Sequence, residues 1–378
     1  MHVQVPFVDL PAQYARIKAE IDAAIAQVLA DAAFIRGKYV EEFERAYAEA
    51  HGVRHCIGVG NGTDALHIGL RALRIGPGDE VLVPALTWIS TAEAVSLTGA
   101  RPVFVDIEPE YYTIDPRHAE AKITERTKAI IPVHLYGQPA DMDPLLELAQ
   151  RHGLSILEDC AQAHFARYRE RLVGTFGALA AFSFYPSKNL GAFGDGGALL
   201  TDDDALAYFV RIFANHGSLT KHEHEIEGIN SRLDGLQAAI LSVKLRYIHH
   251  WNQQRAERAQ RYAELLADVE ELALPRIRPN CTHVFHLFVV RTLRRDELQK
   301  FLAERGIQTQ LHYPRALPFV PAYQHFRHRP EDFPIAWQYQ QELLSLPLYP
   351  ELTEEQLRYV ADAIKSFFAH QRQSIVRP

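Results

Sequence analysis

Between residues 55 and 201, short apolar segments of β-forming residues alternate with segments of helical periodicity, and this alternation constrains the fold more than any other feature. The strand-like segments span residues 56–59, 81–83, 102–105, 129–133 and 155–157. Because such strands are apolar on both faces, helices must cover both sides of the sheet that they form. The sequence therefore predicts an α/β fold with a large, mostly parallel sheet, whose ligands bind at the carboxyl ends of the strands.

The segments on either side of this alternation predict further helices and a smaller domain. Residues 17–29 and 40–49 have apolar side chains at helical spacing, and residues 236–266 indicate one long bridging helix or two helices in series. We place a domain boundary there and predict a large domain, 1–245, and a small α+β domain, 246–378. The elements expected in the small domain are strands at 285–290 and 309–312 and helices at 295–305 and 353–370, the last capped by Thr353.

The composition narrows the partners and the compartment. The 378 residues carry a formal charge of -7, which disfavours a general affinity for nucleic acid or anionic membranes. No apolar segment approaches the roughly 20 residues that cross a bilayer, and we expect a cytoplasmic protein without a secretory signal. The three cysteines include no C-x-x-C pair, which indicates reduced thiols. The loop K-H-E-H-E at 221–225 alternates charge as a solvated loop does, so we expect no metal site.

A glycine-rich turn, G-V-G-N-G-T-D-A at residues 58–65, follows the first strand and opens a helix. Free N–H groups at a helix start bind phosphate, and glycines let a ligand approach the backbone. A tight turn with a capping side chain explains the pattern about equally well, and a degenerate dinucleotide fingerprint is a third interpretation. The full G-x-G-x-x-G is absent, so the turn alone does not decide between them.

Two further strand ends carry side chains with a specific chemistry. One strand ends in the carboxylate of Asp159, and another, ending near Ser183, leads into Lys188. Pyridoxal phosphate needs a lysine amine for its aldehyde, a carboxylate for its pyridine nitrogen, and N–H and hydroxyl donors for its phosphate. Lys188, Asp159 and the glycine turn with Ser183 supply all three. A solvated lysine or a helix-capping aspartate would explain either residue alone, but the set indicates a cofactor site.

The same segments resemble the DegT/DnrJ/EryC1/StrS family of sugar aminotransferases, which have the type I pyridoxal-phosphate fold. The resemblance extends from V-P-F-V-D-L at 5–10 to L-P-L-Y-P at 346–350. It implies a homodimer whose active sites lie at the subunit interface. Its most specific motifs are N-G-T-D-A-L at 61–66, V-H-L-Y-G-Q at 133–138, E-D-C-A-Q at 158–162, the block at 183–197 and G-I-N-S-R-L-D at 228–234.

By this resemblance, each cofactor-binding residue has an implied role. Lys188 holds the cofactor as a Schiff base, Asp159 pairs with the pyridine nitrogen, and Gln162 bonds near the ring hydroxyl. Trp88 stacks on the ring face, although a core aromatic is its plain alternative. Asn230, otherwise a turn residue, reaches the phosphate in the neighbouring subunit. The other implied phosphate ligands are Ser183 and the amides of Gly62 and Thr63.

The resemblance also implies the reaction, an amino transfer from L-glutamate to a nucleotide-linked keto-sugar. The segments 185–191 and 230–234 resemble the branch that acts on 3-keto sugars, in which Tyr185, His312 and Tyr313 line the sugar pocket. We therefore expect dTDP-3-keto-6-deoxyhexose to be converted to dTDP-3-amino-3,6-dideoxyhexose. The alternatives are a UDP-linked or 4-keto sugar, a non-catalytic regulatory homologue, and a nicotinamide dehydrogenase built on the glycine turn.

Overall fold

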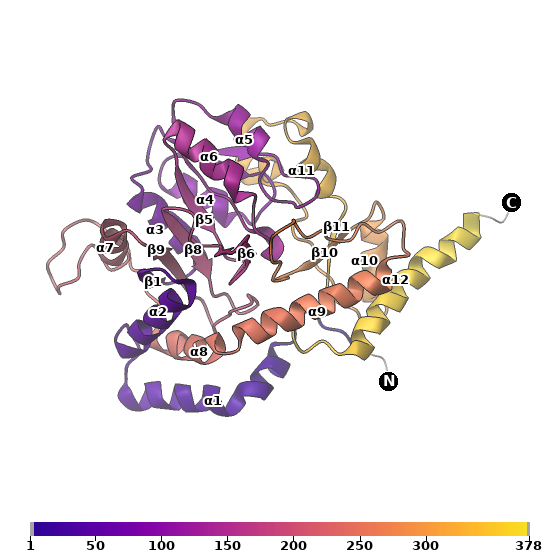
Figure 1. Ribbon diagram of the computed structural model, residues 1–378, viewed down its shortest axis with the longest axis horizontal. Coiled ribbons are helices and arrows are strands. Elements are labelled where there is room, and N and C mark those ends of the chain that lie inside the picture. Colours follow the sequence, from indigo (N-terminus) through magenta and orange to yellow (C-terminus); the bar gives the residue numbers. More distant parts are fainter. Residues whose placement is uncertain (1–3, 376–378) are drawn as a thin grey trace.

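The computed structural model, which describes residues 4–375, has a seven-stranded sheet at its centre (Figure 1). The strands lie in the order β1-β9-β8-β5-β4-β2-β3, and all run parallel except β9, which is antiparallel to both of its neighbours. The predicted α/β fold with a mostly parallel sheet is confirmed. The strands are β1 His55–Val59, β2 Glu80–Pro84, β3 Arg101–Val105, β4 Thr127–Ile130, β5 Ser155–Asp159, β8 Leu179–Ser183 and β9 Gly197–Thr201.

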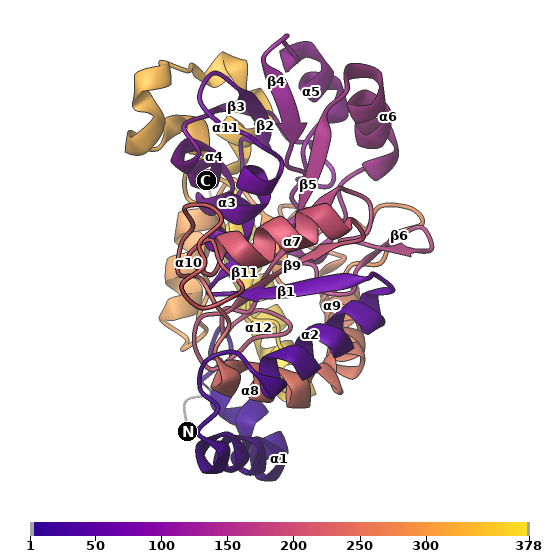
Figure 2. The same ribbon diagram turned by 90° about the vertical axis from the view of Figure 1, so that its left-hand side faces the viewer.

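Both faces of this sheet are buried by helices, as the apolar strands predict (Figure 2). Val81 and Val83 of β2 lie in one hydrophobic cluster, whereas Leu82 between them lies in the cluster on the other face. Leu157 and Ile156 of β5 divide in the same way. The helices that follow the strands are α3 Gly62–Ala72, α4 Ser90–Leu97, α5 Pro116–Lys122, α6 Met142–His152 and α7 Asp204–Phe213.

Two helices in series lead from the large sheet to the C-terminal elements, which confirms one of the two interpretations of residues 236–266. They are α8, Gly235–Leu245, and α9, Ile248–Leu266. A smaller sheet, which pairs β10, Phe288–Arg291, with β11, Leu343–Leu346, packs against the C-terminal half of α9. The helices α10 Arg295–Ala303 and α12 Glu354–Ile375 accompany it (Figure 1).

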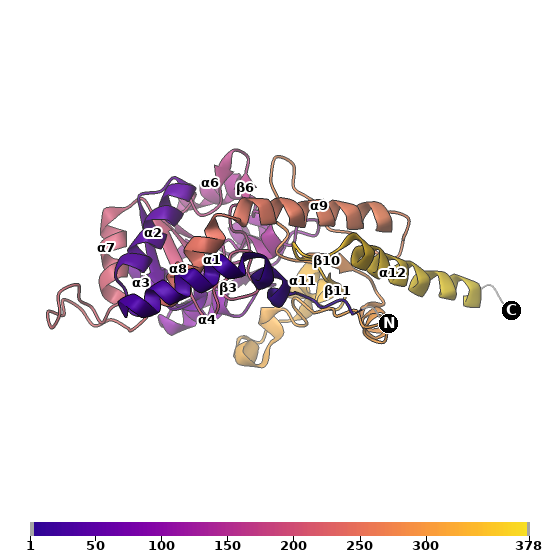
Figure 3. The ribbon, with the colours of Figure 1, turned by 90° about the horizontal axis from the view of Figure 1, so that it is seen from below.

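The remaining elements include the two N-terminal helices. The first helix, α1, spans Leu10–Asp31 and lies beside α8 (Figure 3). The second, α2, Lys38–His51, packs against α8 and β1. Among the described residues, no helix combines the length and the apolar character needed to cross a bilayer. The short elements are η1 Leu135–Gly137, β6 Arg167–Tyr168, β7 Arg171–Leu172, η2 Leu317–Phe319, η3 Pro321–Phe326, η4 Pro330–Asp332 and α11 Pro334–Tyr339.

The predicted strand at 309–312 is wrong. Within this segment Gln310 alone forms a bridge, with Ser345. The chain then turns toward the large sheet, where the Tyr136 hydroxyl donates a hydrogen bond to the carbonyl of His312. The tertiary contact therefore replaces the strand pairing that the local sequence suggests.

Two other predicted strands are shorter in the structure. The strand expected at 129–133 ends at Ile130, because Pro132 has no N–H to donate to a ladder. The strand expected from residue 285 begins to pair at Phe288. The residues before Phe288 bond instead to the segment 136–137, as when the amide of Val284 donates to the Gly137 carbonyl at 2.9 Å.

The C-terminal part of the chain also contacts the large sheet. Leu317, Phe333 and Tyr339 belong to the same hydrophobic cluster as the central strands. The cap of the last helix is as predicted, since the Thr353 hydroxyl accepts a hydrogen bond from the amide of Gln356 at 3.1 Å. We propose that the domain boundary lies near residue 245, where α8 ends.

Candidate active site

The glycine turn between β1 and α3 packs directly against the ends of two neighbouring strands. A Cβ atom added to Gly62 would lie 2.6 Å from Cβ of Ser183, and one added to Gly197 would overlap the carbonyl group of Asn61. A side chain at Gly62 would therefore fill the space beside Ser183. The close approach explains why glycine occupies this position.

The start of α3 presents free hydrogen-bond donors at this turn. The side chain of Asn61 caps the helix by accepting from the amide of Asp64 at 2.8 Å. Within residues 4–375, the amides of Gly62 and Thr63 make no hydrogen bond. The hydroxyl of Thr63 lies 2.7 Å from that of Ser90. With the positive end of the helix dipole behind them, the two amides form a site for an anion.

Asp159 lies at the carboxyl end of β5 with its carboxylate buried and oriented by two donors. The hydroxyl of Thr91 donates to Oδ2 at 2.9 Å, and the amide of Ala161 donates to Oδ1 at 3.2 Å. Burial raises the pKa of Asp159, while both donors and the charge of Lys188 oppose the rise. Thr91 was missed in the sequence, although it lies one helical turn after Trp88 in the segment that follows β2.

Lys188 lies in a tight loop after β8, close enough to Asp159 for each charge to act on the other. Burial lowers the pKa of Lys188 to about 8, and the charge of Asp159 opposes the change. The amide of Lys188 donates to the carbonyl of Tyr185 at 2.8 Å, which closes the loop. A lysine with this pKa has a larger fraction of neutral amine near pH 7 than an exposed lysine has.

Gln162 joins segments that lie far apart in the chain. Its Oε1 accepts from the amide of Tyr136 at 2.7 Å, and its Nε2 donates to the hydroxyl of Tyr313 at 2.9 Å. The Tyr313 ring lies 5.9 Å from the ring of Trp88. Beside it, Nδ1 of His312 lies 2.8 Å from the hydroxyl of Ser345. The structure thus brings these four predicted site residues to one place.

His164 supports the wall of the site and was also missed in the sequence. Its Nε2 lies 2.9 Å from the carbonyl oxygen of Ser183, which can only accept, so Nε2 carries the proton. The Tyr47 hydroxyl then donates to Nδ1 at 2.8 Å. Burial lowers the pKa of His164 to about 3, so its ring stays neutral. Its position two residues after Gln162 is the only sequence signal for this role.

A hydrogen-bonded carboxylate fixes the strand end that carries Asp159. Nε2 of His134 donates to Glu158 at 3.0 Å, and the amides of Gly174, Phe176 and Gly177 donate to the same carboxylate at 2.7–2.8 Å. Cys160 lies beside this group. The donors account for both oxygens of Glu158, which therefore anchors the end of β5 to the loop before β8.

At the outer rim, three predicted residues are exposed. Trp88 and Tyr185 expose 58% and 56% of their surface. Asn230 is exposed, and its side chain makes no hydrogen bond among the described residues. Its backbone forms an isolated antiparallel bridge with Asn215. The structure therefore does not join Asn230 to the groups around Lys188 within one chain.

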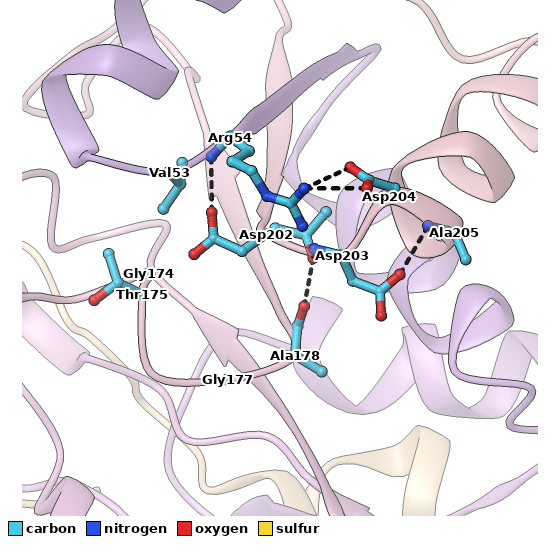
Figure 4. Close-up of a pocket in the computed structure, with 11 residues that line it drawn as sticks. Val53, Arg54, Gly174, Thr175, Gly177, Ala178, Asp202, Asp203, Asp204 and Ala205 are labelled. Carbon is cyan, nitrogen blue, oxygen red and sulfur yellow. Dashed lines mark hydrogen bonds and ion pairs between the residues drawn. The ribbon is translucent and has the colours of Figure 1, made fainter.

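A second hollow lies at the opposite ends of the same strands (Figure 4). There the amide of Arg54 donates to Asp202 at 2.7 Å, and its guanidinium pairs with Asp204 at 3.0 Å. Asp203 caps α7 by accepting from the amide of Ala205 at 2.8 Å. These charged groups satisfy one another, and they lie at the far edge of the sheet from Lys188.

The residues at the carboxyl edge fit pyridoxal phosphate. A buried carboxylate for the pyridine nitrogen, an amine for the aldehyde and unpaired amides for the phosphate all face one region. Asp159 would hold the ring nitrogen and Lys188 the aldehyde carbon. Gly62, Thr63 and Ser183 would hold the phosphate.

Comparison with known proteins agrees with this fit. A model of the DegT/DnrJ/EryC1/StrS aminotransferase family matches residues 15–365. A pleiotropic regulatory protein of Geobacillus stearothermophilus is 46% identical, over 97% of this chain and 100% of its own length. A dTDP-3-amino-3,4,6-trideoxy-alpha-D-glucose transaminase of Streptomyces venezuelae is 48% identical, over 96% of each chain.

Solved structures have the same fold. The crystal structure of S. venezuelae DesV in complex with a ketimine intermediate superimposes with a TM-score of 0.94 at 48% identity, covering 96% of this chain and 98% of that one. NtdA from Bacillus subtilis, with bound cofactor PMP, has a TM-score of 0.89 at 32% identity, covering 96% of this chain and 85% of that one.

Proposed function

Since this chain belongs to the DegT/DnrJ/EryC1/StrS aminotransferase family, we propose that it moves the amino group of L-glutamate to carbon 3 of dTDP-3-keto-6-deoxyhexose. The product is dTDP-3-amino-3,6-dideoxyhexose. The protein is a pyridoxal-phosphate-dependent aminotransferase, as the family match and the relatives establish. The observation that carries the site assignment is that Lys188 and Asp159 act on each other, while neighbouring residues of α4 bond to both Asp159 and Thr63 of the glycine turn.

The roles of the residues follow from their contacts. When bound, pyridoxal phosphate supplies a carbonyl that exchanges amino groups and a protonated ring that takes up electron density. Thr91 and Ala161 donate to Asp159 and favour its carboxylate form, which would hold a proton on the ring nitrogen of the bound cofactor. Lys188, with its pKa near 8, accepts the proton from the substrate carbon and returns it as general base and acid. Gln162 fixes Tyr313 at the sugar side.

A cavity of about 170 Å³ behind the glycine turn supports a nucleotide-linked substrate. Its charged walls are Arg36, Arg211 and Arg232 together with Glu41 and Glu44. Arg211 pairs with Glu44 at 2.9 Å, and three guanidinium groups against two carboxylates leave the lining with an excess of one positive charge. Guanidinium groups bind phosphate through paired N–H donors, so this region suits the diphosphate of a sugar nucleotide.

The proposal includes a homodimer with shared active sites. Leu29, Phe34 and Ile35, at and just after the end of α1, expose large apolar side chains, which supports burial of this surface against a second copy. A symmetric dimer would repeat the contact twice and would bring Asn230 of each chain toward the other. Tyr185, His312 and Tyr313 would then line the sugar pocket from one subunit.

The test measures the two half-reactions separately. Purified protein loaded with pyridoxal phosphate is mixed with L-glutamate, and the loss of its visible absorbance band is recorded. The protein with its cofactor in the amino form is then mixed with dTDP- and UDP-linked sugars that have a keto group at carbon 3 or carbon 4. We expect the highest kcat/KM for the dTDP-linked 3-keto sugar. Absence of the glutamate half-reaction would favour a non-catalytic homologue, and preference for a UDP-linked or 4-keto sugar would correct the substrate.

A further inference from the structure

One hydroxyl group connects both ends of the glycine turn. Oγ of Ser231, which is buried, accepts a hydrogen bond from the amide of Gly60 at 2.9 Å. The same oxygen donates to Oδ2 of Asp64 at 2.6 Å. Gly60 precedes the two unpaired amides of the turn, and Asp64 follows them.

On the side of the glycine turn, this hydroxyl is in close contact with Gly60 and Asp64. A Cβ atom added to Gly60 would lie 3.1 Å from Oγ of Ser231 and 3.3 Å from Oδ2 of Asp64. The amide of Asp64 is already bonded to Asn61 at 2.8 Å. The backbone of the turn therefore has little freedom while Ser231 is in place.

Ser231 is itself fixed from outside the turn. Its amide donates to the carbonyl of Ala214, after α7, at 2.9 Å, and the amide of Ile229 donates to the carbonyl of Phe213 at 2.7 Å. Backbone bonds to the end of α7, outside the glycine turn, therefore hold Ser231 in position. Its hydroxyl can restrain the turn without depending on the contacts that Gly62 and Thr63 make with a ligand.

The bond to Asp64 also controls a negative charge. Asp64 is the third residue of α3, the position from which a carboxylate can reach back to the free amides at a helix start. An unrestrained carboxylate there would compete with an incoming phosphate for those amides and repel it. The hydroxyl of Ser231 holds the carboxylate on the Gly60 side of the turn.

We propose that Ser231 is a positioning residue for the cofactor phosphate, which sets the glycine turn and holds the Asp64 carboxylate away from the amides of Gly62 and Thr63. The proposal rests on the proposed assignment of these amides to the phosphate. It predicts an effect on ligands that carry a phosphate and none on ligands that lack one.

The test compares equilibrium binding of pyridoxal phosphate and of phosphate-free pyridoxal to the apoprotein, followed by absorbance. Ser231→Ala should raise the Kd of pyridoxal phosphate about tenfold, the range of a hydrogen bond to a charged group, and leave the Kd of pyridoxal within about twofold. Asp64→Ala, combined with Ser231→Ala, should recover part of this loss, because the carboxylate that Ser231 restrains can then no longer compete with the phosphate. Ser242→Ala, whose hydroxyl bonds within α8, is the matched control.

The outcomes separate this proposal from the proposed function. An unchanged Kd of pyridoxal phosphate in Ser231→Ala, or equal losses for both ligands, would overturn the positioning role. If Ser231→Ala does not fold, Ser231→Cys, which keeps a similar volume and weakens both bonds of the hydroxyl, must show the same split between the two ligands, and a lack of that split overturns the role. If the unaltered protein binds neither ligand, the cofactor assignment itself fails.

Discussion

Around Asp159 and Lys188, one chain supplies all the contacts that orient the reactive groups, whereas the outer rim of the site lacks such contacts. Asp159 is buried and bonded to Thr91 and Ala161. Trp88 and Tyr185 at the rim are more than half exposed. The inner end is therefore preorganised within one chain, and we propose that the substrate and a second subunit complete the outer end.

This difference implies that changes at the two ends should have effects of different size and kind. Groups whose geometry is already fixed lose catalytic power when they are altered, because nothing else can replace them. Groups at an open rim depend on what covers them, so their effects should depend on the partner. The predictions below test this contrast, beginning at the inner end.

The largest effect is expected at Lys188. Lys188→Ala should abolish turnover, because by the proposed assignment it removes both the amine that takes up the cofactor aldehyde and the base that moves the proton. General acid–base catalysis alone contributes about 10²- to 10⁴-fold. The measurement is the glutamate half-reaction, followed by borohydride reduction and peptide mapping of the unaltered protein.

Two other lysines serve as comparisons for this prediction. Lys221→Ala, in an exposed loop, should leave the half-reaction unchanged. Lys244 is the stricter rival, because burial lowers its pKa to about 8 as well, and its Nζ donates to the carbonyl of Gly191 at 2.7 Å. A stable reduced adduct on Lys244 in place of Lys188 would contradict the assignment.

Asp159→Asn should retain some cofactor but lose most activity. A neutral amide does not hold a proton on the ring nitrogen, and a loss of two pKa units of stabilisation corresponds to about a hundredfold in rate. The measurement is the single-turnover rate constant of the glutamate half-reaction at saturating cofactor and glutamate. Asp204→Asn at the far edge of the sheet should have no effect, and near-normal turnover by Asp159→Asn would refute the pairing.

The sequence predicted the inner end better than the connections around it. Asp159 and Lys188 follow strands whose apolar character is visible locally, and parallel strands bring their carboxyl ends to one edge. The bond between Gln162 and Tyr313 joins residues 151 positions apart. No local periodicity encodes such a contact, and for the same reason Thr91 was missed as the donor to Asp159.

The errors in strand prediction have the same origin. Residues 309–312 have the composition of a strand, but contacts with Tyr136 and Ser345 decide their conformation. Tertiary packing overrides local propensity most easily in short segments, because few ladder bonds are lost. At the rim, only the family resemblance predicted that Asn230 reaches the phosphate in the neighbouring subunit. Its side chain is exposed in the single chain, so this role stays a prediction.

The pH dependence of cofactor capture tests how far the inner end is prepared in advance. Burial lowers the pKa of Lys188 to about 8 from 10.5, so below pH 8 the ammonium form dominates and the amine fraction falls about tenfold per pH unit. The rate at which the apoprotein takes up pyridoxal phosphate should rise up to about pH 8 and level off above it. Stopped-flow absorbance from about pH 6 to pH 10 measures this rate.

Asp159→Asn sharpens this measurement. The charge of Asp159 raises the pKa of Lys188 against the effect of burial, so its removal should move the midpoint to lower pH. A capture rate that still rises tenfold per unit at pH 10 would mean that Lys188 behaves as an exposed lysine. The inner end would then not be prepared for reaction before the cofactor arrives.

The last prediction concerns the rim, where Asn230 is proposed to act in the neighbouring subunit, and its readout, a partial recovery of activity when two variants are mixed, is the smallest signal expected. Asn230→Asp should strongly impair the half-reaction, because a carboxylate repels the phosphate. The Asn230→Asp variant is mixed with an equal amount of Lys188→Ala, and the two are allowed to exchange subunits. Half of the dimers then become heterodimers, in which one site carries both substitutions and the other carries neither. About a quarter of all sites should then be active. The mixture should recover that fraction of the glutamate half-reaction. If no activity returns, Asn230 acts in the site of its own subunit. Elution of the unaltered protein as a monomer on size exclusion would contradict the shared site altogether.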